Sequence, residues 1–148
     1  IVLEITESSV VACLGAALGV LARLRIKGFG ISIDDYGTGF SSMQKLARIP
    51  FTELKIDRSF VHGAHQRRNL RVILQSALDM AHRLELVTVA EGIETLEDWR
   101  LLQELGCTIG QGYLIAKPMP AAALPQWLTS HQGRLRELRA EPLQSCAH

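Results

Sequence analysis

The feature of this sequence that most constrains its fold is a regular alternation of short apolar runs with longer helix-like segments. This alternation predicts right-handed βαβ units and an α/β fold, in which helices cover a parallel sheet. A doubly wound sheet and part of an eightfold barrel both fit the pattern. The runs expected as strands are residues 1–6, 29–35, 52–57, 86–92 and 107–115, and the segments expected as helices are 8–27, 41–48, 67–84, 95–106 and 120–130.

Several predicted helices carry start and stop signals. Ser8 or Ser9 stands at the N-cap position of the first helix, and Gly28 follows its end. Thr95 and Gly106 frame the fourth helix in the same way. These signals indicate that the helices end where the strand-like runs begin.

Composition limits the class of protein. With 148 residues the chain is long enough for one domain with a core. Its 16 basic and 15 acidic side chains nearly cancel, which argues against a DNA or RNA partner. The longest apolar run, residues 10–22, is too short and too rich in glycine for a membrane span. The three cysteines lack metal-ligand spacing, and such free thiols are typical of a reducing cytoplasm.

Polar residues gather near the carboxyl ends of the predicted strands. Parallel strands bring these ends to one rim, where α/β barrels and open α/β sheets place their sites. Each residue also has a structural interpretation: Glu4 could pair with an arginine, and Gln111 could be a core amide. Burying so many ionisable groups without a function is costly, which favours a site. The residues are Glu4, Asp34, Asp35, Lys55, Asp57, Glu91 and Gln111; for Asp57 alone we favour a structural role, capping the next segment.

The carboxylates in this set indicate metal chemistry. Glu4, Asp34 and Asp35 offer hard oxygen ligands, which suit Mg²⁺ or Mn²⁺. Adjacent aspartates can point toward neighbouring positions and bridge two ions, the usual apparatus for in-line attack on a phosphodiester. Lys55 would neutralise charge beside a phosphate, and Glu91 is a candidate proton acceptor. An alternative from chemistry alone is a Schiff base at Lys55.

Five blocks of the sequence resemble, in order, those of the EAL domain family, bacterial phosphodiesterases that linearise cyclic-di-GMP to pGpG. They span about residues 1–128. The resemblance implies a partial TIM-type barrel of about five βα units with parallel strands. The blocks are "LEITES" (3–8), "IDDYGTGFSS" (33–42), "LKIDRSFV" (54–61), "VAEGIET" (89–95) and "GCTIGQGYLIAKPMP" (106–120).

The resemblance also implies roles for individual residues. Glu4, Asp34 and Asp35 are then metal ligands for Mg²⁺ or Mn²⁺, with Asp34 as the bridge. Lys55 lies near the attacking water and Glu91 is the general base. The residues that shape the substrate site are Gln111, Pro118, Glu7, which steadies the loop after the aspartates, and Gly37, Thr38 and Gly39 in that loop. Tyr36 replaces the usual phenylalanine, a mild departure.

A larger departure concerns the start of the domain. The Glu-Ala-Leu motif and a following asparagine ligand do not occur ahead of "LEITES". We therefore expect a truncated EAL domain over residues 1–130, a polar tail over 131–148, and little or no hydrolysis by this chain alone. The alternative is a non-catalytic module that binds nucleotide or protein. Open sheet edges predict a homodimer or association with a missing N-terminal part.

Overall fold

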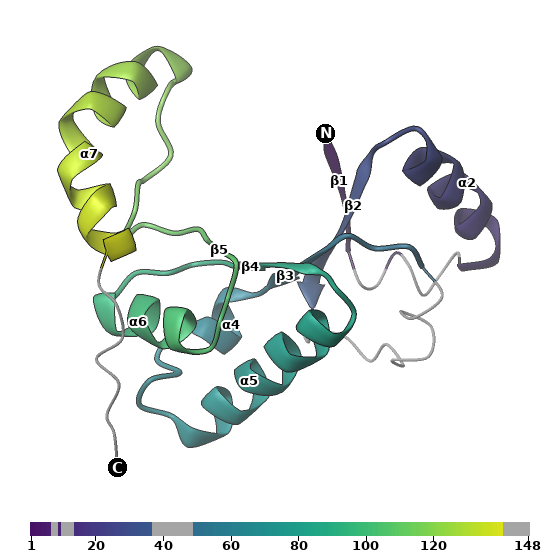
Figure 1. The fold of residues 1–148 in the computed structure, drawn as a ribbon, viewed down its shortest axis with the longest axis horizontal. Coiled ribbons are helices and arrows are strands. Elements are labelled where there is room, and N and C mark those ends of the chain that lie inside the picture. The colour runs from purple at the N-terminus through teal and green to yellow at the C-terminus, as the bar shows by residue number, and fades with distance from the viewer. Residues whose placement is uncertain (7–8, 10–13, 37–48, 141–148) are drawn as a thin grey trace.

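A computed structural model of the chain describes residues 1–6, 9, 14–36 and 49–140, with the backbone alone at 14–17, 35, 139 and 140. Its centre is a five-stranded sheet in the order β1-β2-β3-β4-β5 (Figure 1). Every pair of neighbouring strands is parallel, as predicted. The strands are β1 (Val2–Thr6), β2 (Gly30–Tyr36), β3 (Glu53–Ile56), β4 (Val87–Ala90) and β5 (Ile109–Gly110).

The strand order distinguishes the two architectures that the sequence left open. A doubly wound sheet reverses its strand order at a switch point, whereas a barrel adds each new strand beside the previous one. Here each strand pairs with its successor in the sequence, without a reversal. The described part of the chain therefore has the topology of a partial α/β barrel.

Helices fill the connections between the strands. The one predicted over 41–48 lies outside the described residues. The helix predicted over 67–84 is confirmed as α5, with nearly the expected bounds. The helices are α2 (Leu14–Ile26), α4 (Arg58–Val61), α5 (Arg68–Arg83), α6 (Leu96–Glu104) and α7 (Leu124–Ala140), and a 3₁₀ turn, η1 (Ala121–Ala123), precedes α7.

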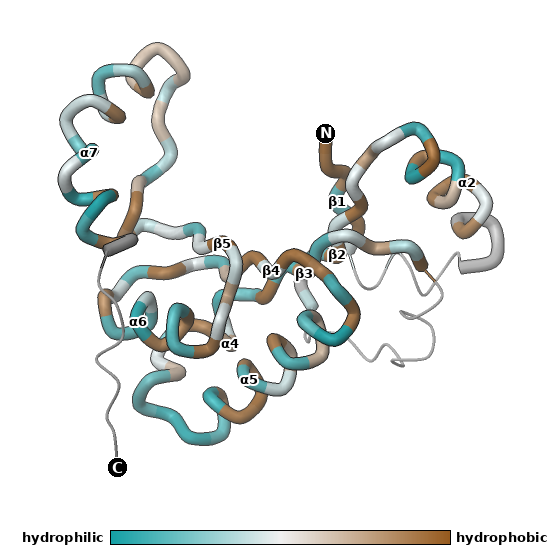
Figure 2. The backbone as a smooth tube through the Cα atoms, in the orientation of Figure 1, coloured by the Kyte–Doolittle hydropathy of each residue, from teal (hydrophilic) through white to brown (hydrophobic). Residues whose placement is uncertain are grey.

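Alternation along the strands separates two faces of the sheet. On one face, Ile33, Leu54 and Ala90 join a buried core with apolar side chains of α5 and α6. Beside it, Leu21 of α2 packs against Ile31 in a smaller cluster. Figure 2 shows the matching pattern: α5 and α6 alternate between apolar and polar positions. All three helices therefore cover the same face, as in a barrel.

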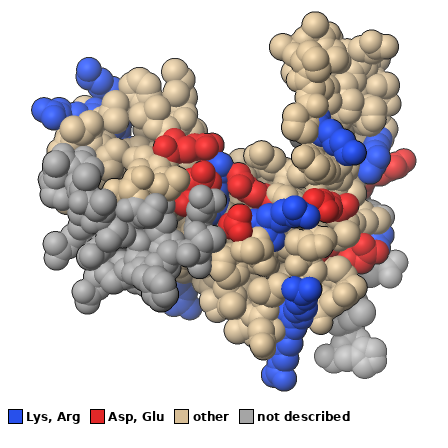
Figure 3. Space-filling view, turned by 180° about the vertical axis from the view of Figure 1, so that it is seen from behind, with Lys and Arg blue, Asp and Glu red and all other residues tan. Residues whose placement is uncertain are grey.

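The opposite face carries the polar residues. Ser32, Asp34 and Lys55 alternate with the core residues of β2 and β3 and so point away from the helices. In Figure 3, acidic and basic side chains form a band across a hollow between two lobes. This is the face that a closed barrel turns inward.

Three of the predicted helix signals are confirmed. The Thr95 hydroxyl accepts a hydrogen bond from the backbone N–H of Asp98, 3.1 Å away, and caps α6. Gly28 and Gly106 follow their helices with φ of 85° and 74°, the left-handed region that glycine adopts without strain. The Ser8 or Ser9 cap falls at the start of a segment that is largely outside the described residues.

Two predicted bounds are wrong. The last helix continues to Ala140 instead of ending at residue 130, because Trp99 and Gln103 both donate to the carbonyl of Leu138 and bind this end of α7. The last strand covers only Ile109–Gly110, not 107–115, because hydrogen bonds to the Gly112 carbonyl turn the backbone there. The domain division at residue 130 stays a prediction.

Within the described residues, none of the helices combines the length and the apolar character that a membrane span requires.

Candidate active site

Lys55 lies at the centre of the predicted site. It stands on β3 with its side chain only 10% exposed, and it forms ion pairs with three acids. Its Nζ lies 3.1 Å from Glu4 Oε2 on β1, 3.1 Å from Asp34 Oδ1 on β2 and 2.8 Å from Glu91 Oε1 after β4. The structure thus brings together four of the predicted residues, one from each of four neighbouring strands or strand ends.

A β-bulge in β2 places the paired aspartates. Ile33 pairs with Leu54 and Tyr36 pairs with Ile56, so three steps along β2 match two steps along β3. Asp34 and Asp35 together therefore stand opposite the single residue Lys55. A bulge of this kind re-aims side chains and is frequent beside active sites. From the sequence we expect that adjacent aspartates can splay toward neighbouring positions, and the bulge is a backbone irregularity at that point.

The surroundings of Lys55 fix its charge. Burial acting alone lowers the pKa of the ammonium, but hydrogen bonds to Glu91, Glu4 and Asp34 outweigh it and raise the pKa above its ordinary value. Lys55 is therefore a permanent cation at neutral pH. A Schiff-base nucleophile must lose its proton before it attacks, so this environment argues against that alternative.

The carboxylates of the Lys55 cluster offer oxygen donors of the kind that a divalent cation prefers. Asp34 Oδ1 is buried and, apart from its ion pair with Lys55, accepts no hydrogen bond from the described residues. A buried carboxylate oxygen with spare capacity suits a hard cation. No group of three or more His, Cys, Asp or Glu side chains in the described part of the chain could hold a metal ion, although the side chain of Asp35 is not among those described. The carboxylate oxygens therefore suit a divalent cation chemically, but the described side chains alone do not form a complete set of ligands for one.

Glycines shape the rim beside Glu91. Gly92 has φ of 65°, and a Cβ there would lie 2.4 Å from the Arg58 side chain. At Gly112 a Cβ would lie 2.2 Å from both the backbone N and O of Ile93. The backbone of Gln111 joins the same rim, because its N–H donates to Ala90 O and its carbonyl accepts from Ile93 N–H. The chain after β5 therefore packs directly on the chain after β4.

The remaining predicted residues lie apart from Lys55 or outside the description. Gln111 and Pro118 are exposed, and no described contact joins them to the Lys55 cluster. Asp57 has the structural role that the sequence favoured: its carboxylate accepts from Ser59 N–H at 2.9 Å and caps α4. That hydrogen bond also lowers the Asp57 pKa. Outside the description lie Glu7, Gly37, Thr38 and Gly39.

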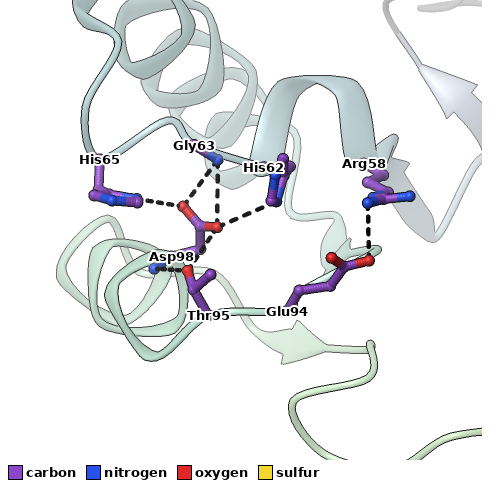
Figure 4. A network of polar contacts seen from close by, with 7 residues as sticks. All are labelled: Arg58, His62, Gly63, His65, Glu94, Thr95 and Asp98. Carbon is purple, nitrogen blue, oxygen red and sulfur yellow. Dashed lines mark hydrogen bonds and ion pairs between the residues drawn. The ribbon is translucent and has the colours of Figure 1, made fainter.

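A second polar network was missed by the sequence analysis (Figure 4). Its centre is Asp98 on α6, whose side chain is fully buried. The carboxylate lies 2.7 Å from His65 Nδ1 and 2.8 Å from the Thr95 hydroxyl, and it also accepts from Gly63 N–H. His62 Nδ1 lies 3.8 Å from the same carboxylate. The spacing Thr95-x-x-Asp98 resembles a capping box and was the available signal.

Hydrogen bonding keeps Asp98 ionised. Burial alone raises its pKa, but hydrogen bonds from His65, Thr95 and Gly63 outweigh it, and the pKa lies below the ordinary 3.8. Beside this network, Arg58 pairs with Glu94 at 2.9 Å (Figure 4). These contacts connect α4 and the segment after it to α6 and the residues just before it. They therefore stabilise the packing of these segments beside the site.

Known proteins resemble most of this chain. The family model of the EAL domain matches residues 1–118. The chain is 40% identical over 120 residues to the cyclic di-GMP phosphodiesterase RocR of Pseudomonas aeruginosa, which covers 81% of this chain and 31% of RocR. It spans between 16% and 31% of the first three curated relatives that it matches.

Solved structures show the same likeness. The PaMucR phosphodiesterase in complex with c-di-GMP matches with a TM-score of 0.78 and 42% identity, over 83% of this chain and 50% of that chain. BlrP1 of Klebsiella pneumoniae, in a manganese and cyclic-di-GMP complex, matches with a TM-score of 0.74 and 35% identity, over 79% of this chain and 30% of that chain. From the profile match and these relatives, the chain belongs to the EAL domain family.

Proposed function

We propose that this chain carries part of the active site of a metal-dependent phosphodiesterase that hydrolyses cyclic-di-GMP to linear pGpG. The observation that supports it most directly is the convergence of Glu4, Asp34 and Glu91 on one buried ammonium, that of Lys55. Relatives named as cyclic di-GMP phosphodiesterases share 40% of their residues with this chain over the matched part. The chemistry of the site and the family point to the same reaction.

In this proposal Glu4, Asp34 and Asp35 hold Mg²⁺ or Mn²⁺. The supporting observation is the Asp34 Oδ1 atom, which is buried and has only Lys55 as a charged partner among the described residues. When bound, such ions polarise the phosphoryl oxygen and activate the attacking water. Lys55 would share the Asp34 carboxylate with them and add a fixed positive charge beside the phosphate.

The proton transfer falls to Glu91. The water oxygen forms a bond to phosphorus while the bond from phosphorus to the ribose O3′ breaks. The proton of the water passes to the Glu91 carboxylate, and the O3′ leaving group takes a proton from solvent. The 2.8 Å contact with Lys55 fixes the position of the Glu91 carboxylate at the site. Gln111 and Pro118 would lie along the nucleotide.

We also propose that the 148-residue chain alone hydrolyses cyclic-di-GMP slowly or not at all. No described set of three or more metal-ligating side chains could hold an ion, and Glu4 is 55% exposed. Site affinity depends on the number and charge of the ligands, so metal binding by this chain would be weak. The same observation favours a second candidate function, a module that binds the nucleotide or a protein without turnover.

Chromatography of the products and calorimetry separate these functions. The chain would be incubated with cyclic-di-GMP and Mn²⁺ or Mg²⁺ to detect the linear product, and titrated with the nucleotide in Ca²⁺ to detect binding. Binding that falls in Asp34→Asn but not in Asp79→Asn, an exposed acid of α5, supports the site. Rapid hydrolysis that disappears in Asp34→Asn would support the phosphodiesterase function. It would also refute the proposal that this chain alone turns over cyclic-di-GMP slowly or not at all. Absence of both binding and hydrolysis would refute the site.

We further propose that the chain works as a homodimer or with a second polypeptide. The end strands β1 and β5 each have a single neighbour in the described sheet. On the face away from the helices, Val2, Val87 and Ile109 are 48%, 38% and 45% exposed. Unpaired edges and exposed apolar side chains favour association with another chain. A monomeric mass in light scattering at micromolar concentration would refute the homodimer.

A further inference from the structure

An apolar cavity of about 450 Å³ lies between α6, β5 and the C-terminal part of α7. Trp99 and Leu102 of α6 form one wall, and Leu135 and Leu138 of α7 form the other. The EAL profile match ends at residue 118, so α7 comes from beyond the matched segment. Figure 1 shows α7 approaching α6 with its C-terminal end, while its N-terminal end points away from the sheet.

Hydrogen bonds hold the two walls of the cavity together. The Trp99 indole N–H donates to Leu138 O at 2.9 Å, and the Gln103 side-chain amide donates to the same oxygen at 3.1 Å. Carbonyls in the last turn of a helix lack partners within the helix, so α6 supplies them here. At Gly110 a Cβ would lie 2.6 Å from the Trp99 ring, and the glycine therefore lets the indole lie against β5.

The lining of the cavity is uncharged. None of its 11 lining residues is an acid, a lysine or an arginine, and the polar side chains are those of Gln103, Cys107 and Thr108. A smaller cavity of about 230 Å³ beside the same helix differs, because Arg134 and Glu137 contribute to its lining.

We propose that the larger cavity binds a small, uncharged aromatic or alicyclic molecule. Its volume lies within the range of roughly 300–1,000 Å³ that is usual for small-molecule sites. Burial against Trp99, Ile115 and the leucines of α7 would drive binding. The Gln103 and Thr108 side chains offer one or two hydrogen bonds. A charged molecule would lose its hydration here without gaining a counterion.

This inference does not depend on the proposed phosphodiesterase function, since no lining residue belongs to the Lys55 cluster.

The test uses N-phenyl-naphthylamine, an uncharged apolar dye whose fluorescence rises on leaving water. The full chain is titrated with the dye. We expect saturable binding at one site, and Leu135→Trp should weaken it by at least roughly tenfold because the new ring fills the cavity. Leu128→Trp is the matched control, since Leu128 lies on α7, is 43% exposed and does not line the cavity.

Two further measurements guard against a misfolded variant. Ile115→Trp fills the cavity from the segment after β5 and should weaken dye binding in the same way. With Cys13→Ser and Cys146→Ser, Cys107 is the single thiol of the chain. Its reaction with iodoacetamide should slow severalfold when the dye is bound, since Cys107 lines the cavity. Absence of saturable binding, or binding that neither tryptophan variant alters, would overturn the proposal.

Discussion

Asp34 Oδ1 lies 3.1 Å from Lys55 Nζ at a bulge where two aspartates stand opposite one lysine. The bulge matters because side chains of a regular strand alternate between faces, so one of two neighbouring aspartates would face the helices. Lys55 also pairs with Glu4 and Glu91, so its charge balances a cluster of acids. The stability of this cluster and its response to cations can be predicted from these contacts.

The first prediction concerns removal of that charge. Lys55→Met keeps an unbranched side chain but leaves Glu4, Asp34 and Glu91 without their shared cation. We expect the free energy of unfolding at neutral pH to fall by about 1–3 kcal/mol, since a buried ion pair that loses one partner leaves uncompensated charge. Denaturation in urea measures the change.

Lys117→Met is the control for this variant, because Lys117 is exposed and its ammonium lies over the ring of Tyr113, 5.8 Å from the ring centroid. It should alter stability by less than about 0.5 kcal/mol. Equal stability of both variants at neutral pH would contradict a central role for the ammonium.

The second prediction concerns cations. Mn²⁺ should raise the midpoint of thermal unfolding, because a ligand that binds only the folded state stabilises it by mass action. Asp34→Asn should lose most of this rise, whereas Lys55→Met should show a larger one, since its carboxylates have no competing ammonium. Differential scanning calorimetry with and without a chelator measures both effects. A rise that survives in Asp34→Asn would place the cation elsewhere.

The third prediction concerns Asp98 and acid. Its folded-state pKa lies below the ordinary 3.8, so its contribution to stability is complete above that pH and is lost as pH falls through the folded value. Asp98→Asn should therefore flatten the acid limb of the curve of stability against pH. Asp98→Ala should cost about 3 kcal/mol at neutral pH, because Gly63, Thr95 and His65 lose their shared acceptor.

Asp79→Ala is the comparison for the acid experiment. Asp79 is exposed on α5, where it accepts a hydrogen bond from Gln75 one turn earlier. At neutral pH this substitution should cost only about 0.2–0.5 kcal/mol. The interpretation of the Asp98 network fails if Asp98→Asn and the unmodified chain show the same slope between pH 5 and 3, a range of roughly two units around ordinary carboxyl pKa values.

The sequence was sufficient for the sheet and for the members of the Lys55 cluster, because both follow from local patterns. Apolar alternation predicts the strands. Parallel strands end at the same edge of a sheet, and this predicts that Glu4, Asp34, Lys55 and Glu91 lie close together. What local patterns do not specify is the pairing between strands. The bulge at Asp34 and Asp35 depends on the register between β2 and β3, and the sequence of β2 alone does not predict it.

The errors have a similar cause. The length of α7 depends on hydrogen bonds to Leu138 from Trp99 and Gln103, which are 39 and 35 positions away in sequence. The Asp98 network likewise depends on His65 and Gly63, which are 33 and 35 positions from it. Each of these residues is unremarkable in its own segment. Tertiary contacts override the local pattern at both places.

The last prediction concerns two glycines that differ in their surroundings. A Cβ at Gly112 would lie 2.2 Å from the backbone N and O of Ile93, and backbone cannot move aside as a flexible side chain can. Gly112→Ala should therefore cost about 1–3 kcal/mol and weaken nucleotide binding by displacing Gln111. At Gly133, inside α7, a Cβ would meet no atom of the described residues within 4 Å apart from the backbone of its own helix, and Gly133→Ala should stabilise by about 0.5–1 kcal/mol. Urea denaturation of the two variants should give changes in the free energy of unfolding with opposite signs. A Gly112→Ala variant as stable as the unmodified chain would contradict the close packing of the backbone after β5 on the backbone after β4.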